Sequence, residues 1–380
     1  MLDIIHQRQQ RWVPVVSFTG KPLMPCHPAR ARKLVSRGKA TTRFLKGLFY
    51  IQLTERADGD TQPTALGIDP GSKREGYTVK ATKRTFLNIH AHAVDGKGIQ
   101  KTLEGRSNAR RSSRQRNTPY RANRKNRGRS KGWVPPSTRA RWQLKLNVTL
   151  WLTRLYPLTT VVVEDVSAEL KKGDKRRNSG FSPVQNGKNW FYRQLTATGL
   201  SLVTKRGMET YQLRQQLGLH KTKQKLAMLF SAHCVDSWAL AFMAVGGDTT
   251  SDLTALVELK QLRYVRRQLH RFNPGKGGAR SRYGGTMSLG FKRGTLVSHP
   301  KYGKCFVGGN DGVDRVSLHS PVSRVRVCQF AKMSELTKIA HTPWTLTDPT
   351  TFHKAHKRGL RLQKKDHRAQ LTHALNPSPA

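Results

Sequence analysis

The sequence carries a large excess of positive charge, and this excess limits what the chain can form by itself. Among 380 residues, 70 are Lys or Arg and 22 are Asp or Glu, which gives a formal net charge of +48. Self-repulsion of that size opposes a compact state unless a polyanion neutralises it. A few solvated lysine faces do not explain so widespread an excess, so we expect nucleic acid as the partner.

The positive charge is densest between residues 101 and 150, which hold fifteen Lys or Arg and a single acid, Glu104. Arginines four residues apart in this stretch would share one face of a helix. A block of like charge this long is normally disordered alone, and we expect it to lie along phosphates and become ordered on binding. With basic residues of other segments, the expected nucleic-acid contacts are Arg30, Arg32, Arg106, Arg110, Arg111, Arg114, Arg121, Arg124, Arg280, Arg282, Lys292 and Arg293.

Cysteine spacing and hydropathy argue against other classes of protein. The four cysteines form no CxxC pair, so we expect neither zinc fingers nor a disulfide framework, and a reducing cytoplasm fits. The apolar run from Leu226 to Val245 contains His233 and Asp236, which are costly in lipid. We therefore interpret this run as a helix of a soluble core and expect no membrane partner.

Apolar periodicity and turn residues predict a mixed α/β chain. Three successive strands between residues 64 and 94 predict an antiparallel meander, and alternation between residues 294 and 319 predicts a small β-barrel. The expected strands are 13–18, 41–45, 48–53, 64–69, 76–80, 85–94, 159–166, 200–204, 295–297, 304–307 and 315–318. The expected helices are 28–37, 138–155, 189–199, 224–245 and 259–271.

Three acids lie where these elements would bring them together. Asp69 ends the first strand of the meander, Glu164 lies at the end of a later strand, and Asp236 follows His233 by three residues on the apolar helix. If a helix separates the third strand from the fourth, the first and fourth strands become neighbours and the last helix crosses their ends. We therefore expect an RNase H-like mixed sheet that gathers Asp69, Glu164 and Asp236.

Three buried carboxylates repel one another unless a cation compensates them. Two Mg²⁺ ions about 3.5–4 Å apart, which Mn²⁺ is able to replace, would do so while activating water and stabilising the leaving oxygen of a phosphodiester. His233 would orient or deprotonate the water, or help to hold the second ion.

Other interpretations of these residues stay open. Asp69 before Pro-Gly-Ser fits a turn-capping aspartate, and Glu164-Asp165 fits a strand-end cap. Strand alternation allows either Glu164 or Asp165 to face inward. His233 alone fits a hydrogen-bonded core histidine. Asp236 in an apolar helix is harder to explain without a partner, because an unpaired buried carboxylate is unfavourable.

These residues together resemble a known family. The resemblance covers nearly the whole chain and points to the IsrB family, which is related to IscB. It rests on Lys21–Pro25 as the PLMP motif, Gly67–Ser72, Val161–Asp165 and His233-x-x-Asp236 as three RuvC motifs, the Arg-rich stretch 104–131 as a bridge helix, and residues 294–319 as a target-adjacent-motif region.

The resemblance implies an RNA-guided DNA endonuclease, encoded by transposons and ancestral to type II CRISPR effectors. The partners would be a long structured guide RNA, with one protein per RNA, and double-stranded target DNA that forms an R-loop. The location would be the prokaryotic cytoplasm at the nucleoid. The implied domains are 1–56 (PLMP), 57–100 (RuvC part I), 101–134 (bridge helix and basic segment), 135–170 (RuvC part II), 171–188 (linker), 189–258 (RuvC part III) and 259–380 (target-adjacent-motif domain and basic tail).

One feature of the sequence departs from IscB and distinguishes a resemblance to IsrB from a resemblance to IscB. IscB carries an HNH nuclease between the second and third RuvC motifs, but only 68 residues lie between Glu164 and His233, with no Cys and a single histidine, His220. An HNH site needs a catalytic histidine and metal ligands. The chain therefore resembles IsrB, and the expected product of its one site is a nick, by analogy in the displaced strand.

Three other functions compete with this interpretation. A nuclease of resolvase or transposase type would need no RNA, and co-purifying RNA would argue against it. A non-catalytic RNA scaffold predicts no role for the acids. An actin-like ATPase also starts with a strand and an Asp-x-Gly turn, but the sequence offers no second phosphate-binding glycine loop.

Overall fold

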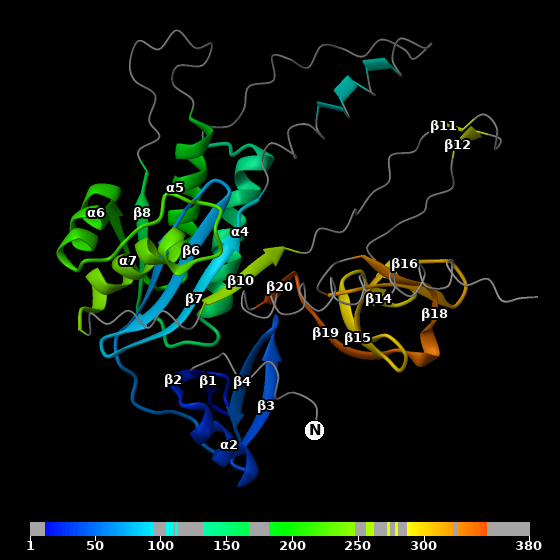
Figure 1. Cartoon of the computed structure of the whole chain (residues 1–380), viewed down its shortest axis with the longest axis horizontal. Helices are drawn as coiled ribbons and strands as arrows, with labels where there is room; N and C mark the ends of the chain where they lie inside the picture. Colours follow the sequence, from blue (N-terminus) through cyan, green and yellow to red (C-terminus); the bar gives the residue numbers. More distant parts are fainter. Residues whose placement is uncertain are drawn as a thin grey trace, which may run out of the picture. The chain divides into compact units, whose positions relative to one another are not determined.

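Figure 1 shows the computed structural model, in which the chain has a mixed α/β fold, as the sequence predicts. The chain divides into two compact units, Met1–Arg43 with Phe49–Glu258 and Asp348–Ala380, and Phe44–Leu48 with Leu259–Thr347. None of the described helices is both long and apolar enough to cross a bilayer. The described residues are 12–94, 104–105, 107–108, 111–112, 132–166, 182–247, 256–261, 272–273, 278–279, 287–321 and 325–347.

The first unit begins with a four-stranded sheet in the order β2-β1-β4-β3. Pro28 starts the helix that follows β2, and the expected extent of this helix is confirmed to within a residue. The predicted hairpin is also confirmed, and Lys46 and Gly47 turn it with positive φ angles of 50° and 94°. The elements are β1 (Val13–Val16), β2 (Pro22–Cys26), α2 (Pro28–Ser36), β3 (Ala40–Leu45) and β4 (Leu48–Leu53).

The central sheet of this unit contains the strands in the order β10-β7-β6-β5-β8-β9. β5, β6 and β7 form the predicted antiparallel meander, and β8 runs parallel to β5 and to β9. The expected neighbourhood of the first and fourth strands is therefore confirmed. The strands are β5 (Thr64–Asp69), β6 (Arg74–Ala81), β7 (Arg84–His92), β8 (Thr160–Asp165), β9 (Ser201–Arg206) and β10 (Leu256–Gln261).

Helices cover both faces of the sheet. α7 (Val235–Val245) packs on β5, β6 and β8 and contacts α6 (Gly207–Gln216). α4 (Pro136–Leu152) and α5 (Pro183–Thr196) contact each other, and Lys145 of α4 reaches Glu75 of β6. Glu75 and Gly76 alternate along β6, and Gly76 lies against the turn that leads into α7. The α4–α5 face and the α7 face are thus opposite faces of the sheet.

Several expected element boundaries were wrong. The apolar helix starts at residue 230 rather than 224, with a π-helical turn, η1 (Phe230–Cys234), before α7; Leu226 and Leu229 are exposed, so packing does not favour a helix there. α5 starts at Pro183 rather than Asn189, because Ser182 Oγ accepts a hydrogen bond from the Gln185 N–H and caps it.

Two further segments differ from expectation. Residues 259–261 belong to strand β10 rather than to a basic helix, because Leu259 is buried in the sheet; the remainder of that expected helix, 262–271, lies outside the described residues. α6 was not predicted, because its residues carry no apolar stripe and it buries only Thr210 and Arg214.

The second unit contains a five-stranded antiparallel sheet in the order β18-β17-β16-β15-β19. Its core includes Val297, Val307 and Leu318, one from each of the three strands expected at 295–297, 304–307 and 315–318. These three strands are confirmed, while their closure into the expected small barrel stays a prediction. The elements of this unit are β11 (Phe272–Asn273), β12 (Gly278–Ala279), β13 (Met287–Ser288), β14 (Phe291–Lys292), β15 (Thr295–His299), β16 (Gly303–Asn310), β17 (Arg315–His319), β18 (Arg326–Lys332), η3 (Met333–Glu335), β19 (Thr337–His341) and β20 (Trp344–Thr347).

Candidate metal centre

Asp69, Glu164 and Asp236 come together in the structure. One carboxylate oxygen of each lies within 4.8 Å of the others. Asp69 ends β5, Glu164 is the penultimate residue of β8, and Asp236 lies in the first turn of α7. No other such trio of His, Cys, Asp or Glu side chains is found among the described residues. The gathering expected from sequence is therefore present, while the roles of the three acids stay predictions.

Strand register explains why Glu164 joins this group and Asp165 does not. Gly67 of β5 pairs with Val162 of β8, and residues two further along each strand, Asp69 and Glu164, point to the same face. Asp165 points to the opposite face, where its Oδ1 accepts a hydrogen bond from the Tyr192 hydroxyl at 2.9 Å and lies 2.7 Å from Lys188 Nζ. The structure thus decides a choice that the sequence left open.

Glycines allow the elements that carry the acids and His233 to pack close together. A Cβ on Gly67 would lie 1.8 Å from the Ser237 carbonyl oxygen, and one on Gly76 would lie 2.4 Å from the His233 carbonyl oxygen. Side chains at these two positions would push η1 and α7, and with them His233 and Asp236, away from Asp69. A Cβ on Gly207 would similarly meet Glu164 Oε1 at 2.6 Å. Sequence reasoning missed these roles, because close approach leaves no local pattern.

His233 is fixed at both ring nitrogens. Its Nδ1 lies 2.7 Å from Asp69 Oδ2, and its Nε2 lies 3.1 Å from the Lys225 carbonyl oxygen. The side chain of His233 is 12% exposed, so the ring is held almost entirely within the protein. The predicted proximity of His233 to the acids is present, and Asp69 is the acid that it contacts.

Two cations that the sequence did not indicate compensate Asp236. Lys221 Nζ donates a hydrogen bond to Asp236 Oδ2. Arg214 Nε lies 2.8 Å from Asp236 Oδ1, as an ion pair without the alignment of a hydrogen bond. Lys221 comes from the irregular segment before η1, and Arg214 comes from the unpredicted α6. Neither position carries a sequence signal that separates it from the many other basic residues.

The positive charge near the three acids is too small to compensate them fully, as the pKa values of Glu164 and Asp236 show. Burial raises the pKa of Glu164 to about 7, and repulsion from Asp69 and Asp236 adds to the effect. Burial likewise raises the pKa of Asp236, against the opposing effects of Lys221 and Arg214. The trio therefore resists being fully ionised by itself. A divalent cation would remove this resistance, and carboxylate oxygens are the ligands that Mg²⁺ and Mn²⁺ prefer.

A second histidine, which the sequence did not single out, lies behind His233. His90 of β7 is fully buried, and its ring centroid is 5.4 Å from that of His233. Burial lowers the pKa of His90 to about 4, with further lowering by His233 and Arg74. Neither ring nitrogen of His90 has a hydrogen-bond partner among the described residues. His90 is therefore a neutral ring that packs against His233.

The expected nucleic-acid contacts are only partly covered by the described residues. Arg30 and Arg32 are exposed on α2, Arg111 and Lys292 are exposed, and Arg293 Nε donates a hydrogen bond to Ser288 Oγ at 3.3 Å. The other expected contacts, Arg106, Arg110, Arg114, Arg121, Arg124, Arg280 and Arg282, lie outside the described residues.

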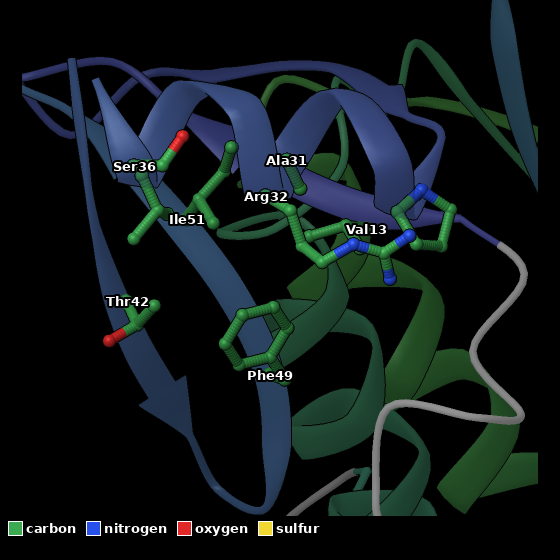
Figure 2. A pocket seen from close by; sticks show the side chains of 9 residues that line it. Val13, Ala31, Arg32, Ser36, Thr42, Phe49 and Ile51 are labelled. Atoms are coloured by element: carbon green, nitrogen blue, oxygen red, sulfur yellow. The ribbon is translucent and has the colours of Figure 1, made fainter. Parts of the chain in front are cut away.

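A cavity of about 210 Å³ lies elsewhere, in the N-terminal part of the first unit. Residues of α2, β1, β3 and β4 line it, among them Arg32, Phe49 and Ile51, and Figure 2 shows their side chains. The lining contains no acid and no histidine, so the groups suited to metal chemistry are those at the sheet and not those at this cavity.

Comparison with known proteins adds a partial family match. A family model described as "RRXRR protein" matches residues 13–187, which is less than half of the chain and includes Asp69 and Glu164 but not Asp236. No curated protein matches the chain.

Matching solved structures are distant. They include a chain of a CRISPR-Cas12f ternary complex, at 12% identity and a TM-score of 0.31 over 58% of this chain and 49% of that chain. They also include the yeast mitochondrial Holliday junction resolvase Ydc2, at 13% identity and a TM-score of 0.25 over 48% of this chain and 79% of that chain. The match thus spans about half of the Cas12f-complex chain. Both TM-scores are below 0.5, so neither likeness establishes a shared fold.

Proposed function

We propose that this protein is a Mg²⁺-dependent, RuvC-like endodeoxyribonuclease that nicks DNA under the direction of a guide RNA. The observation that carries the proposal is the meeting of Asp69, Glu164 and Asp236, from three separate elements, within 4.8 Å of one another in a chain of net charge +48. A strongly basic chain attracts nucleic acid, and a local group of acids within it suits divalent cations beside a phosphodiester.

The residues divide the chemistry among them. Asp69, Glu164 and Asp236 would hold the metal ions, which when bound supply Lewis-acid activation of water and of the leaving oxygen. His233, whose two ring nitrogens are engaged by Asp69 and by the Lys225 carbonyl oxygen, would hold the Asp69 carboxylate in position. Orienting the attacking water or taking its proton would require one of these two bonds to open. Lys221 and Arg214 balance the charge of Asp236 from the protein side.

Guidance by RNA is the finer part of the proposal. It is supported by the net charge of +48, by the basic block between residues 101 and 150, and by the motifs that resemble IsrB. In this scheme a long structured RNA pairs with the target strand, the β-rich second unit contacts the target-adjacent motif, and the carboxylate site cuts the displaced strand. The domain boundaries drawn from that resemblance are part of the same proposal.

The test uses the full chain with its co-purified RNA and a supercoiled plasmid that contains the matching target. Asp69→Asn is expected to lose Mg²⁺-dependent nicking by about 10³-fold or more, because several kcal/mol of metal-assisted stabilisation disappear. Asp165→Asn is the matched control, since this neighbouring acid faces the other side of β8 and pairs with Lys188. Normal nicking by Asp69→Asn would reject the site.

The RNA is tested separately. Removing the co-purified RNA should abolish target-specific nicking, and binding should weaken steeply with salt because many phosphates are neutralised. If the RNA-free protein nicks the same DNA equally well, the nuclease is of the RNA-independent class and guidance is rejected.

A further inference from the structure

Arg74 of β6 lies next to the carboxylate site, on the face of the sheet that carries Asp69 and toward the end at which β5 stops. Gly76 of β6 pairs with Asp69 of β5, and Arg74 precedes Gly76 by two residues. Residues two apart on a strand point to one face, so Arg74 lies on the face of Asp69, about 7 Å further along the strand. Of the β6 residues on that face, Arg74 lies nearest to the C-terminal ends of β5 and β8.

A chain of hydrogen bonds holds the Arg74 side chain in place. Arg74 lies directly opposite His92 in the β6–β7 register, and Arg74 Nη1 donates a hydrogen bond to His92 Nδ1. A guanidinium only donates, so His92 accepts at Nδ1 and carries its proton on Nε2. His92 Nε2 in turn lies 2.5 Å from Glu258 Oε1 on β10. Glu258 is buried, and through His92 it fixes the direction of Arg74.

This arrangement differs from that of the cations at Asp236. Lys221 and Arg214 are bound directly to a carboxylate of the cluster. Arg74 is instead held by a neutral ring, and its buried Nε has no hydrogen-bond partner among the described residues. A guanidinium has five N–H donors, of which the bond to His92 uses one. Arg74 therefore keeps donors for an anion and is kept from neutralising the acids.

We propose that Arg74 binds a backbone phosphate of the DNA strand, adjacent to the phosphodiester that occupies the carboxylate cluster. The inference rests on the proposed nuclease function and adds a substrate contact to it. A strand that crosses three carboxylates is repelled by them wherever no metal lies between, so a fixed cation beside the cluster would set its position. The planar guanidinium matches two phosphate oxygens at once, and His92 with Glu258 pre-orients it. In this role Arg74 contacts substrate, and His92 and Glu258 are positioning residues.

The experiment combines an arginine substitution with neutral phosphates in the DNA. Nicking is measured on DNA whose phosphates next to the cut site are replaced, one at a time, by methylphosphonate. The wild-type complex should lose about 10- to 100-fold in rate at one of these positions, the size of a charge-assisted contact. Arg74→Ala should lose a similar factor on ordinary DNA, mainly through a higher KM, and should show no additional loss at that one position.

Two further variants keep the test specific. Arg56→Ala removes an equal charge from an exposed arginine that donates to the Asp58 carbonyl, and it should retain both wild-type nicking and full methylphosphonate sensitivity. Glu258→Leu leaves Arg74 in the chain but removes the acceptor of His92, and it should give a partial loss with reduced sensitivity at the same position. Thermal unfolding of each complex identifies a variant that fails to fold.

The outcomes separate this inference from the function on which it rests. If Asp69→Asn is inactive while Arg74→Ala nicks with wild-type KM and rate, the nuclease stands and the Arg74 contact is rejected. The contact is also rejected if Arg74→Ala remains sensitive to methylphosphonate at every position. If Asp69→Asn nicks normally, the nuclease site itself is rejected, whatever Arg74 does.

Discussion

The acids on the two faces of the central sheet are compensated by positive charge in different ways. On the α4–α5 face, each acid has its own lysine: Lys145 Nζ lies 2.6 Å from Glu75 Oε1, and Lys188 Nζ lies 2.7 Å from Asp165 Oδ1. On the α7 face, three acids gather, and Lys221 and Arg214 both contact the same one, Asp236. One-to-one pairing satisfies the charges and joins helix to sheet. Three acids gathered around one point keep uncompensated negative charge, and this arrangement is typical of a site that binds a cation.

Breaking an ion pair on the α4–α5 face should have the largest effect on the free energy of unfolding. Lys145→Met leaves Glu75, which is fully buried and also accepts from the Tyr77 hydroxyl at 2.5 Å, without its cation. We expect the free energy of unfolding to fall by about 3–5 kcal/mol, measured by urea denaturation. Adding Glu75→Gln should recover part of the loss, because no unpaired charge is then buried. Equal stability of Lys145→Met and wild type would mean that this face is not held by the pair.

The α7 face should show a pH dependence that the other face lacks. The pKa of Glu164 is about 7 in the folded protein and near 4.5 when exposed, so the folded state binds the proton more tightly. In chelator, this group should therefore make the protein less stable as pH rises from about 4.5 to 7, by about 2–3 kcal/mol in total. Glu164→Gln should remove that slope.

Protonation of His90 changes the stability of the protein with pH in the opposite direction. Its pKa is lowered to about 4 by burial, so the unfolded chain binds this proton more tightly and stability rises with pH through the same range. The measured quantity is thus the difference between the wild-type and Glu164→Gln unfolding curves at each pH. If the difference in the free energy of unfolding between wild type and Glu164→Gln does not change with pH, the proposed electrostatic difference between the two faces is rejected.

The cations of the α7 face should become dispensable when a divalent ion is present. Lys221→Ala is expected to lower the free energy of unfolding by about 1–2 kcal/mol in chelator, because Asp236 keeps only Arg214. Mg²⁺ or Ca²⁺ should restore most of the difference, which thermal unfolding with and without the ion would show. Lys145→Met is the matched control, since no divalent ion should restore it. Rescue of both variants, or of neither, would contradict the division between the faces.

The smallest effect is expected at Asp165. Its side chain is 32% exposed, so the pair with Lys188 is weakened by solvent. Asp165→Asn should cost about 0.5–1 kcal/mol and leave nicking unchanged. A large loss of nicking would place Asp165, and not only Glu164, in the site.

Some of the site was predictable from local pattern. Asp69 and Glu164 each follow an apolar, strand-forming run, and the order of elements made their strands neighbours. Asp236 was conspicuous as an acid in an apolar helix. The expected helix start at residue 224 was wrong, because hydropathy alone does not show that Leu226 and Leu229 remain exposed.

By itself the sequence determined the charge, three strands of the second unit, strands β5 to β9 of the central sheet and the three acids that meet on it, because these follow from composition and short-range alternation. Tertiary structure alone decided which of Glu164 and Asp165 faces the cluster, that Lys221 and Arg214 balance Asp236, and that Glu258 and His92 orient Arg74. Glu258 and His92 are 166 residues apart in the chain. Contacts of this kind depend on how whole elements pack, and that packing leaves no mark on the residues nearby in sequence.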